Sequence, residues 1–224
     1  MTNSTLPPTL LAELVAAKFT HDVAGPVSAM ANGVELMGEN ADDADMQREA
    51  TELLRMSSTE LKSRVQLYRQ AYGVISGGGQ CGVEEVEGTL KDYFQYLKTD
   101  CSLVAPTGGA AVTSLNFHGR RLLINGVLLV AGLLIGKATI RVSLYNKHDG
   151  IIDINVLGTA LKSRQDEDVD AIFEERFDST KLSVKNIQPY MTRQFAQELG
   201  AKVQVKVEGA SVELKAQCPQ KTIC

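Results

Sequence analysis

Residues 10–37 read LLAELVAAKFTHDVAGPVSAMANGVELM, and the spacing of their apolar side chains predicts the architecture of the N-terminal part. These side chains recur every three or four positions, which is the period of one face of an α-helix. The apolar stripe consists of Leu11, Val15, Phe19, Val23, Val27, Met30, Val34 and Met37. A single helix of this length is about 40 Å long.

A second amphipathic segment follows a short break at residues 38–43 (GENADD). The acidic side chains of this break suit the positive N-terminal end of a second helix, which we expect to continue to about Tyr72. Its apolar residues are Met46, Ala50, Leu53 or Leu54, Leu61, Val65, Tyr68 and Tyr72. Two such helices form an antiparallel hairpin, which cannot cover both stripes alone. We therefore expect a homodimer in which two hairpins form a four-helix bundle.

A glycine-rich stretch separates this hairpin from the rest of the chain. Gly73 and residues 76–79 (SGGG) have the composition of a flexible linker, which is typical of a domain boundary. We expect a helical hairpin domain at residues 1–75, a linker at 76–82 and a second domain at 83–224.

The second domain mixes helical and strand patterns. We expect helices at about 84–97, from 120 onward through an apolar run, and at 166–175 and 184–199. Expected strands lie near 103 and at 113–117, 139–145, 151–157, 202–207 and 211–216. Paired strands combined with helices predict an α+β sandwich with one layer of each.

Composition excludes several classes of protein. The chain has 224 residues and a net charge of −4, so it lacks the basic surface of a nucleic-acid or anionic-membrane binder. The longest apolar run, Leu122 to Gly136, is shorter than the roughly 20 residues of a membrane span, and no signal peptide is apparent. The four cysteines lack metal-site or disulfide-framework spacing, which fits a reducing cytoplasm. We expect a cytoplasmic protein whose partner is a protein or a small molecule.

His21 is the candidate for chemistry. It lies about 160° around its helix from the apolar stripe, so its imidazole should point into solvent. The adjacent carboxylate of Asp22 can hold one ring nitrogen as N–H and raise the basicity of the other. His21 and Asp22 are therefore candidate catalytic residues, although an exposed histidine on an amphipathic helix is most often an ordinary surface residue.

The surroundings of His21 suit the close approach of a partner. The small or polar side chains that share or flank its face are Ala24, Gly25, Ser28 and Asn32. Lys18, one turn earlier, can offset negative charge on an arriving group. Pro26 has no N–H to donate to the carbonyl of Asp22, so we expect the helix to kink near His21.

Residues 21–27 (HDVAGPV), on the first arm of a long hairpin, resemble the H-box of the dimerisation and phosphotransfer domain of two-component histidine kinases. In that motif an acid follows the histidine and a proline comes five residues after it. Residues 29–36 (AMANGVEL) and 184–193 (VKNIQPYMTR) add a further likeness. Over residues 10–217 the chain is similar to histidine phosphotransferases of the ChpT type from alphaproteobacteria.

The resemblance implies that the second domain is a degenerate histidine-kinase ATPase (Bergerat) domain. The best candidate for the Asp-x-Gly-x-Gly motif is residues 156–160 (VLGTA), which lack its Asp and its last Gly. No glycine lies between Gly158 and Gly200 to form a phosphate-covering lid, and Asn125 has no second Asn four residues later. We therefore expect no bound ATP, cofactor or metal, with Mg²⁺ held by a partner receiver domain.

The resemblance also implies a phosphorelay role. His21 would accept a phosphoryl group from the aspartyl phosphate of a receiver domain on a hybrid kinase and pass it to a response regulator. Gly25 stands where bifunctional kinases often carry a water-orienting Thr or Asn, so we expect no strong phosphatase activity. An ATP-dependent histidine kinase and a non-catalytic dimeric scaffold remain as alternatives.

His118 and His148 are expected in loops with structural roles, and the acidic residues from Asp166 to Glu175 on a solvated helix face.

Overall fold

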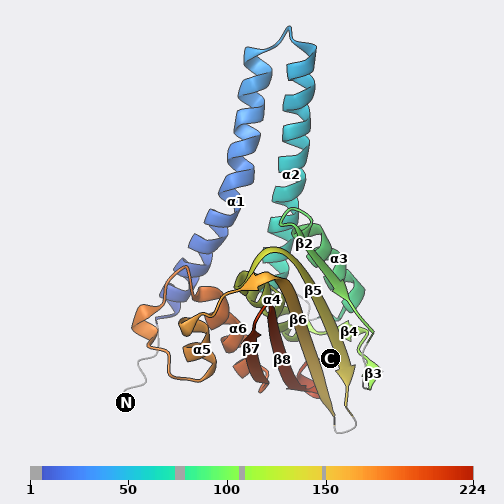
Figure 1. The fold of residues 1–224 in the computed structure, drawn as a ribbon, viewed down its shortest axis with the longest axis vertical. Helices are drawn as coiled ribbons and strands as arrows, with labels where there is room; N and C mark the ends of the chain where they lie inside the picture. The colour runs from blue at the N-terminus through green and yellow to red at the C-terminus, as the bar shows by residue number, and fades with distance from the viewer. Residues whose placement is uncertain (1–6, 74–78, 106–108, 148–149, 224) are drawn as a thin grey trace.

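The computed structural model describes residues 7–73, 79–105, 109–147 and 150–223. Helices α1 (Pro8–Glu39) and α2 (Ala44–Tyr72) form a long antiparallel hairpin that projects from an α/β part (Figure 1). The carboxylate of Asp43 opens α2 by accepting from the backbone N–H groups of Asp45 and Met46. Gln47 closes the turn by donating to the carbonyls of Met37 and Asn40. The predicted hairpin is confirmed.

Within the hairpin, α1 packs on α2 through small residues as well as through Phe19, whose ring lies edge-to-face on Tyr68. Pro26 and Gly33 are buried, and a Cβ on Gly33 would lie 2.8 Å from Leu54 Cγ, so the glycine lets the helices approach closely. Val34, in contrast, is 62% exposed, and Val27 is exposed as well. A single hairpin therefore leaves part of its apolar stripe uncovered, as expected from its size.

The α/β part is built on one mixed sheet. Its strands are β2 (Thr99–Leu103), β5 (Leu134–Asn146), β6 (Ile151–Ser163), β8 (Ser211–Pro219) and β7 (Lys202–Glu208), in that order, and β3 (Ala110–Ala111) pairs with the end of β5. Strands β2 and β5 are parallel, and the other neighbours are antiparallel. The strands β1 (Cys81–Gly82) and β4 (Ser114–Leu115) form a separate pair. The predicted α+β class is confirmed.

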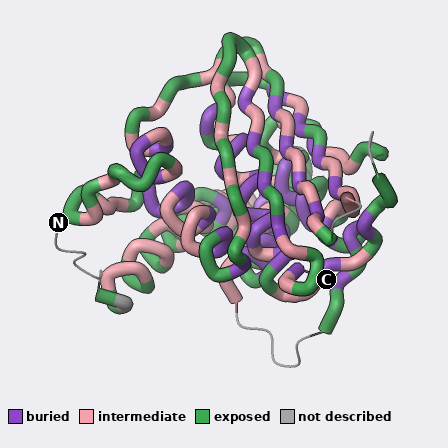
Figure 2. The backbone as a smooth tube through the Cα atoms, turned by 90° about the horizontal axis from the view of Figure 1, so that it is seen from below, coloured by how far each residue is buried: buried purple, intermediate pink, exposed green. Residues whose placement is uncertain are grey.

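The sheet is covered by helices, and α4 (Phe117–Leu133) is the central one. The remaining helices are α3 (Val83–Phe94), α5 (Glu167–Phe173), α6 (Ile187–Glu198) and α7 (Gln220–Ile223), with a 3₁₀ turn at Ser179–Lys181. Most of α4 is buried, which confirms the predicted core helix, and buried residues gather where the helices meet the sheet (Figure 2). Among the described residues, no helix is both long and apolar enough to cross a bilayer.

The end of the hairpin belongs to the same core as the sheet. Leu67 and Ala71 on α2 are fully buried in the cluster that contains α4 and the inner face of the sheet. Arg121 on α4 donates to the backbone carbonyl of Tyr72, which fixes the last turn of α2. The core is thus continuous across the expected boundary at residue 75. Residues 74–78, which include the first part of the expected linker at 76–82, lie outside the described part of the chain, so the domain limits stay a prediction.

Two local expectations, on the length of two strands and on His118, need correction. Strands β5 and β6 are longer than predicted, because Gly158 lies within β6 instead of ending it: a Cβ there would lie 2.5 Å from Val130, so the glycine permits α4 to pack on the sheet. His118 lies in the first turn of α4 and not in a loop, since the side chain of Asn116 caps this helix through the N–H of Gly119. His148 lies outside the described residues.

Candidate functional site

His21 projects from α1 into solvent. Its side chain is 84% exposed, and its Nδ1 lies 3.2 Å from Asp22 Oδ1. An ionised carboxylate can only accept a hydrogen bond, so this contact places the ring proton on Nδ1 and leaves the lone pair of Nε2 free. The predicted outward direction of the imidazole agrees with this geometry.

The carboxylate of Asp22 is held on its other side. Its Oδ2 accepts from Lys18 Nζ at 3.2 Å and from the hydroxyl of Tyr68 on α2. The side chain of Asp22 is only 16% exposed. Burial alone would raise the pKa of Asp22, but the hydrogen bond from Tyr68 and the charge of Lys18 outweigh it and hold this pKa below its usual range. Asp22 is therefore an anion at neutral pH.

The sequence predicts Tyr68 only as a member of the apolar stripe of α2. The structure buries it, with its ring edge-to-face on Phe19 at 5.1 Å between centroids and 5.6 Å from the ring of Tyr72. Burial, and the hydrogen bond to Asp22, raise the pKa of Tyr68, so its hydroxyl stays protonated and serves as a donor. The sequence offers only a coarse signal for these contacts. Residues at similar distances before and after a hairpin turn lie near one another, which places Tyr68 in the same region of the hairpin as Phe19 and Asp22.

A hollow of about 370 Å³ opens beside His21. Gly25, Pro26 and Ala29 line it from α1, and Glu60 and Arg64 line it from α2. The Arg64 guanidinium is paired with the Glu60 carboxylate at 2.6 Å, and both side chains are largely covered. Sequence reasoning missed this pair, although its spacing of four residues from Tyr68 places all three on one face of α2.

The expected docking residues divide between two surfaces. Ala24, Gly25, Ser28 and Asn32 are all exposed on α1. Lys18 is partly buried, and it turns toward Asp22 instead of standing on the outer face with His21. Pro26 lies inside α1, which continues through it, and Figure 1 shows the N-terminal half of the helix leaning away from α2. The kink at this proline stays a prediction.

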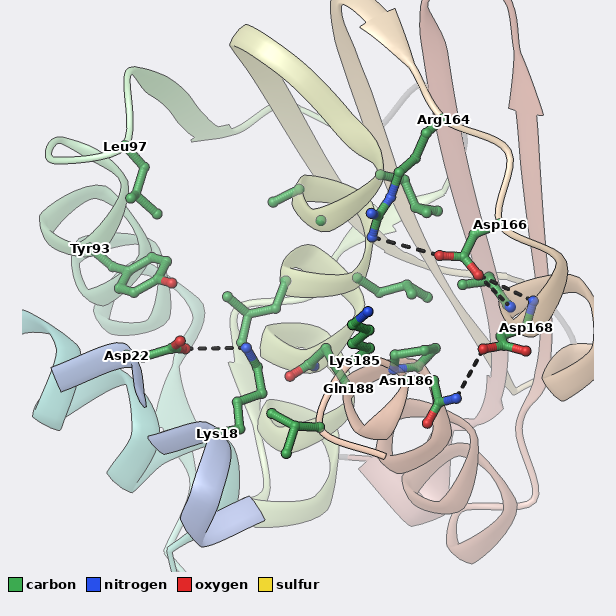
Figure 3. A pocket seen from close by; sticks show the side chains of 18 of the residues that line it. Lys18, Asp22, Tyr93, Leu97, Arg164, Asp166, Asp168, Lys185, Asn186 and Gln188 are labelled. Carbon is green, nitrogen blue, oxygen red and sulfur yellow. Dashed lines mark hydrogen bonds and ion pairs between the residues drawn. The ribbon is translucent and has the colours of Figure 1, made fainter. Parts of the chain in front are cut away.

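A larger cavity of about 600 Å³ lies behind the histidine, between the hairpin and the α/β part. Figure 3 shows Lys18 and Asp22 on one side of it and Lys185 on the other. Two carboxylates from the acidic segment line this cavity and have partners: Asp166 pairs with Arg164 at 3.6 Å and caps α5, and Asp168 accepts from Asn186 at 2.9 Å. For these two residues the expected solvated role is wrong, because they fix the segment that precedes α6.

The residues expected at a nucleotide site have structural roles. Asn125 is fully buried; its amide donates to the carbonyl of Ala71 and accepts from Gln188 at 2.7 Å. Residues 156–158 lie in the middle of β6, where they pair with β5 on one side and β8 on the other. In the part of the chain that the structure describes, no group of three or more His, Cys, Asp or Glu side chains could hold a metal ion.

Comparisons with known proteins agree with this fold. Residues 83–211, more than half of the chain, match the sequence model of a family described as histidine phosphotransferase C-terminal domain. Protein phosphotransferase ChpT of Brucella abortus (strain 2308) is 27% identical over 213 residues, which cover 92% of this chain and 95% of that protein. A bacterial phosphotransferase solved at 1.7 Å has a TM-score of 0.77 and 22% identity, covering 96% of this chain and 100% of that one, and this likeness concerns the fold.

Proposed function

The chain belongs to the histidine phosphotransferase family, and from this premise we propose that it relays phosphoryl groups between receiver domains through His21. The observation that carries the proposal is the geometry of that side chain. The imidazole is exposed, its Nδ1 is held by Asp22, and its Nε2 has a lone pair available to an arriving phosphorus atom.

The proposed step needs no nucleotide. Nε2 of His21 attacks the phosphorus of an aspartyl phosphate on the receiver of a hybrid histidine kinase, forming an N–P bond. The P–O bond to the aspartyl group breaks, and its electron pair leaves with the carboxylate of the receiver. The reverse reaction then transfers the phosphoryl group to a response regulator. The aspartyl phosphate of the receiver and the phosphorylated His21 are both labile. Positioning and charge neutralisation are therefore the main tasks of the site.

The proposal excludes ATP as the donor. Asn125, the one asparagine that the resemblance offers for Mg²⁺, has its amide committed to Ala71 and Gln188 in the core. Gly158 is committed to close packing of α4 on β6. We expect no cofactor on this chain and assign Mg²⁺ to the partner receiver, whose acidic site would hold it beside the phosphoryl group.

We further propose that the protein acts as a homodimer. The exposed large apolar side chains of the hairpin are Val27, Val34, Met56 and Val65. Uncovered apolar side chains on a helical hairpin favour pairing with a second hairpin into a four-helix bundle. His21 lies about 120° from Val27 around α1, so this pairing would leave the imidazole open to a receiver.

The docking surface would be the outer face of α1 around His21. Ala24, Gly25 and Ser28 are exposed and small, so the backbone of a partner can approach the imidazole closely. Receivers and response regulators of this kind act in the cytoplasm, and the three described cysteines, Cys81, Cys101 and Cys218, are buried and unpaired, which suits that compartment.

Transfer of label tests the relay. A receiver carrying ³²P on its aspartate should pass label to the wild-type protein and not to His21→Ala, whereas His118→Ala, which removes another exposed histidine, should accept label like the wild type. Incubation with labelled ATP should leave the protein unlabelled. Self-labelling from ATP would favour the kinase alternative, and receiver binding without any transfer would favour the scaffold.

A further inference from the structure

We propose that Tyr68 is a positioning residue for the relay, which orients Asp22 so that this carboxylate fixes the reactive tautomer of His21. The inference rests on the proposed function. It concerns a residue on α2 that makes no contact with a receiver in the proposed reaction and acts only through its hydrogen bond to Asp22.

The two oxygens of Asp22 have separate partners. Oδ1 faces Nδ1 of His21 at 3.2 Å, and Oδ2 accepts from the Tyr68 hydroxyl and from Lys18. A carboxylate bound at both oxygens cannot rotate about its terminal bond without losing a contact. The hydrogen bond from Tyr68 therefore determines where Oδ1 lies, and Oδ1 in turn determines which ring nitrogen of His21 carries the proton.

Tyr68 is better suited to this anchoring than Lys18. The side chain of Lys18 is 27% exposed and flexible, and its ammonium makes a point contact. Tyr68 is 8% exposed, and its ring is held by Phe19 on α1 and by Tyr72 on its own helix. Its hydroxyl is aimed at Asp22 from the neighbouring helix, so this contact links the orientation of the carboxylate to the packing of the hairpin.

The tautomer of His21 decides whether its Nε2 can attack phosphorus. An unconstrained imidazole populates both neutral tautomers, and only the tautomer protonated at Nδ1 offers a lone pair at Nε2. When Nε2 bonds to phosphorus, the Nδ1 proton stays on the ring, which becomes positively charged as the partner carboxylate leaves. The fixed anion of Asp22 then lies beside this developing charge, and no proton has to move in the step.

Tyr68→Phe tests the inference, because it retains the ring and removes only the hydroxyl. We expect receiver-to-His21 transfer to slow about tenfold, the effect of losing one hydrogen bond to a charged group. The ¹⁵N chemical shifts of His21 in the protein alone should show a smaller Nδ1–H fraction. Tyr93→Phe is the matched control. Tyr93, like Tyr68, lines the larger cavity between the hairpin and the α/β part, but its hydroxyl has no hydrogen-bond partner among the described residues. It should leave both measurements unchanged.

The Asp22→Asn background separates positioning from packing. If Tyr68 acts through Asp22, adding Tyr68→Phe to Asp22→Asn should slow transfer by less than about twofold more. An equal tenfold loss in that background, an unchanged tautomer ratio in Tyr68→Phe, or equal slowing by Tyr93→Phe would overturn the inference. Failure of the proposed function gives a different result, because the wild-type protein would then take no label from any receiver. In that case the tautomer measurement would still test the role of Tyr68.

Discussion

Gln188 on α6 donates its side-chain amide to the Asn125 side chain on α4 at 2.7 Å, with both residues buried. Gln188 also accepts from the Tyr72 hydroxyl at the end of α2, and Asn125 donates to the backbone carbonyl of Ala71 in the same turn. Three helices thus meet at one satisfied polar network inside an apolar core. This network fixes the hairpin on the α/β part by direct contact, independently of the glycine-rich linker.

Asn125→Leu should destabilise the protein by about 1–3 kcal/mol, because it removes the bonds of Asn125 to the Gln188 amide at 2.7 Å and to the Ala71 carbonyl at 3.2 Å. The two groups then keep only longer contacts, at 3.3 Å to the backbone carbonyl of residue 125 and at 3.4 Å to Arg121. Denaturant unfolding would measure this as a lower midpoint with an unchanged slope. Asn155→Leu on β6 is the matched control, because Asn155 Oδ1 already lacks a partner, and we expect a change within about 1 kcal/mol. Equal midpoints for Asn125→Leu and the wild type would show that the network adds nothing to stability.

Val34→Lys should convert a dimer to a monomer. Val34 is 62% exposed on α1, and a lysine there would place a charge inside the apolar seam of the proposed four-helix bundle. Sedimentation velocity would measure the loss of the dimer. Leu161→Lys, at an apolar position on β6 outside the hairpin that is 81% exposed, should keep the wild-type mass. A wild-type protein that sediments as a monomer, or a Val34→Lys variant that remains dimeric, would refute the proposed seam.

Periodicity predicted those parts of the molecule whose structure depends on local sequence. The hairpin helices, the core helix α4 and the exposed direction of His21 all follow from apolar side chains three or four residues apart. The hydrogen bond from Tyr68 to Asp22 did not follow. It depends on how far α1 and α2 slide past one another, and that register is set by close packing at Gly33 against Leu54, which a periodic pattern does not specify.

Glycine was the residue most open to misinterpretation. Gly158 appears in the sequence as the remnant of a nucleotide loop, yet in the structure it provides room for Val130 and Leu134 in the middle of a strand. Both roles require a residue without a side chain, so composition alone cannot distinguish them. Asn125 poses the same problem, because a metal ligand and a buried hydrogen-bonding residue share one side-chain type.

The stabilising contribution of Asp22 should decrease as the pH falls. Its pKa is lower in the folded protein than in the unfolded chain, so its stabilising contacts are fully present above about pH 4 and are lost as the pH falls through the folded pKa. Asp22→Asn should therefore cost about 1 kcal/mol near neutral pH and progressively less below about pH 4. Urea unfolding at both ends of this range measures the difference. Asp42→Asn, in the exposed hairpin turn, serves as control, and a cost for Asp22→Asn that stays constant on acidification would contradict the assignment.

Gly25 lies one turn after His21, in the hollow where a receiver would dock. A Cβ built at this position meets nothing within 4 Å, so a side chain fits there without displacing the protein. The native residue offers no group that could orient a water molecule toward the phosphoryl group of a docked receiver. This absence is the physical basis for expecting relay without phosphatase activity.

In a His21→Ala background, where relay is blocked, the protein should leave the decay rate of a phosphorylated receiver within about twofold of its intrinsic value. Adding Gly25→Asn places an amide at the edge of the hollow, and we expect it to accelerate decay about threefold or more by orienting the attacking water. Gly25→Ala fills the same position without a polar group and should have no effect. Loss of ³²P from the receiver measures all three rates. Marked acceleration while Gly25 is still present would contradict this expectation and would mean that another side chain lining the hollow, such as the Glu60 carboxylate on α2, already orients the water.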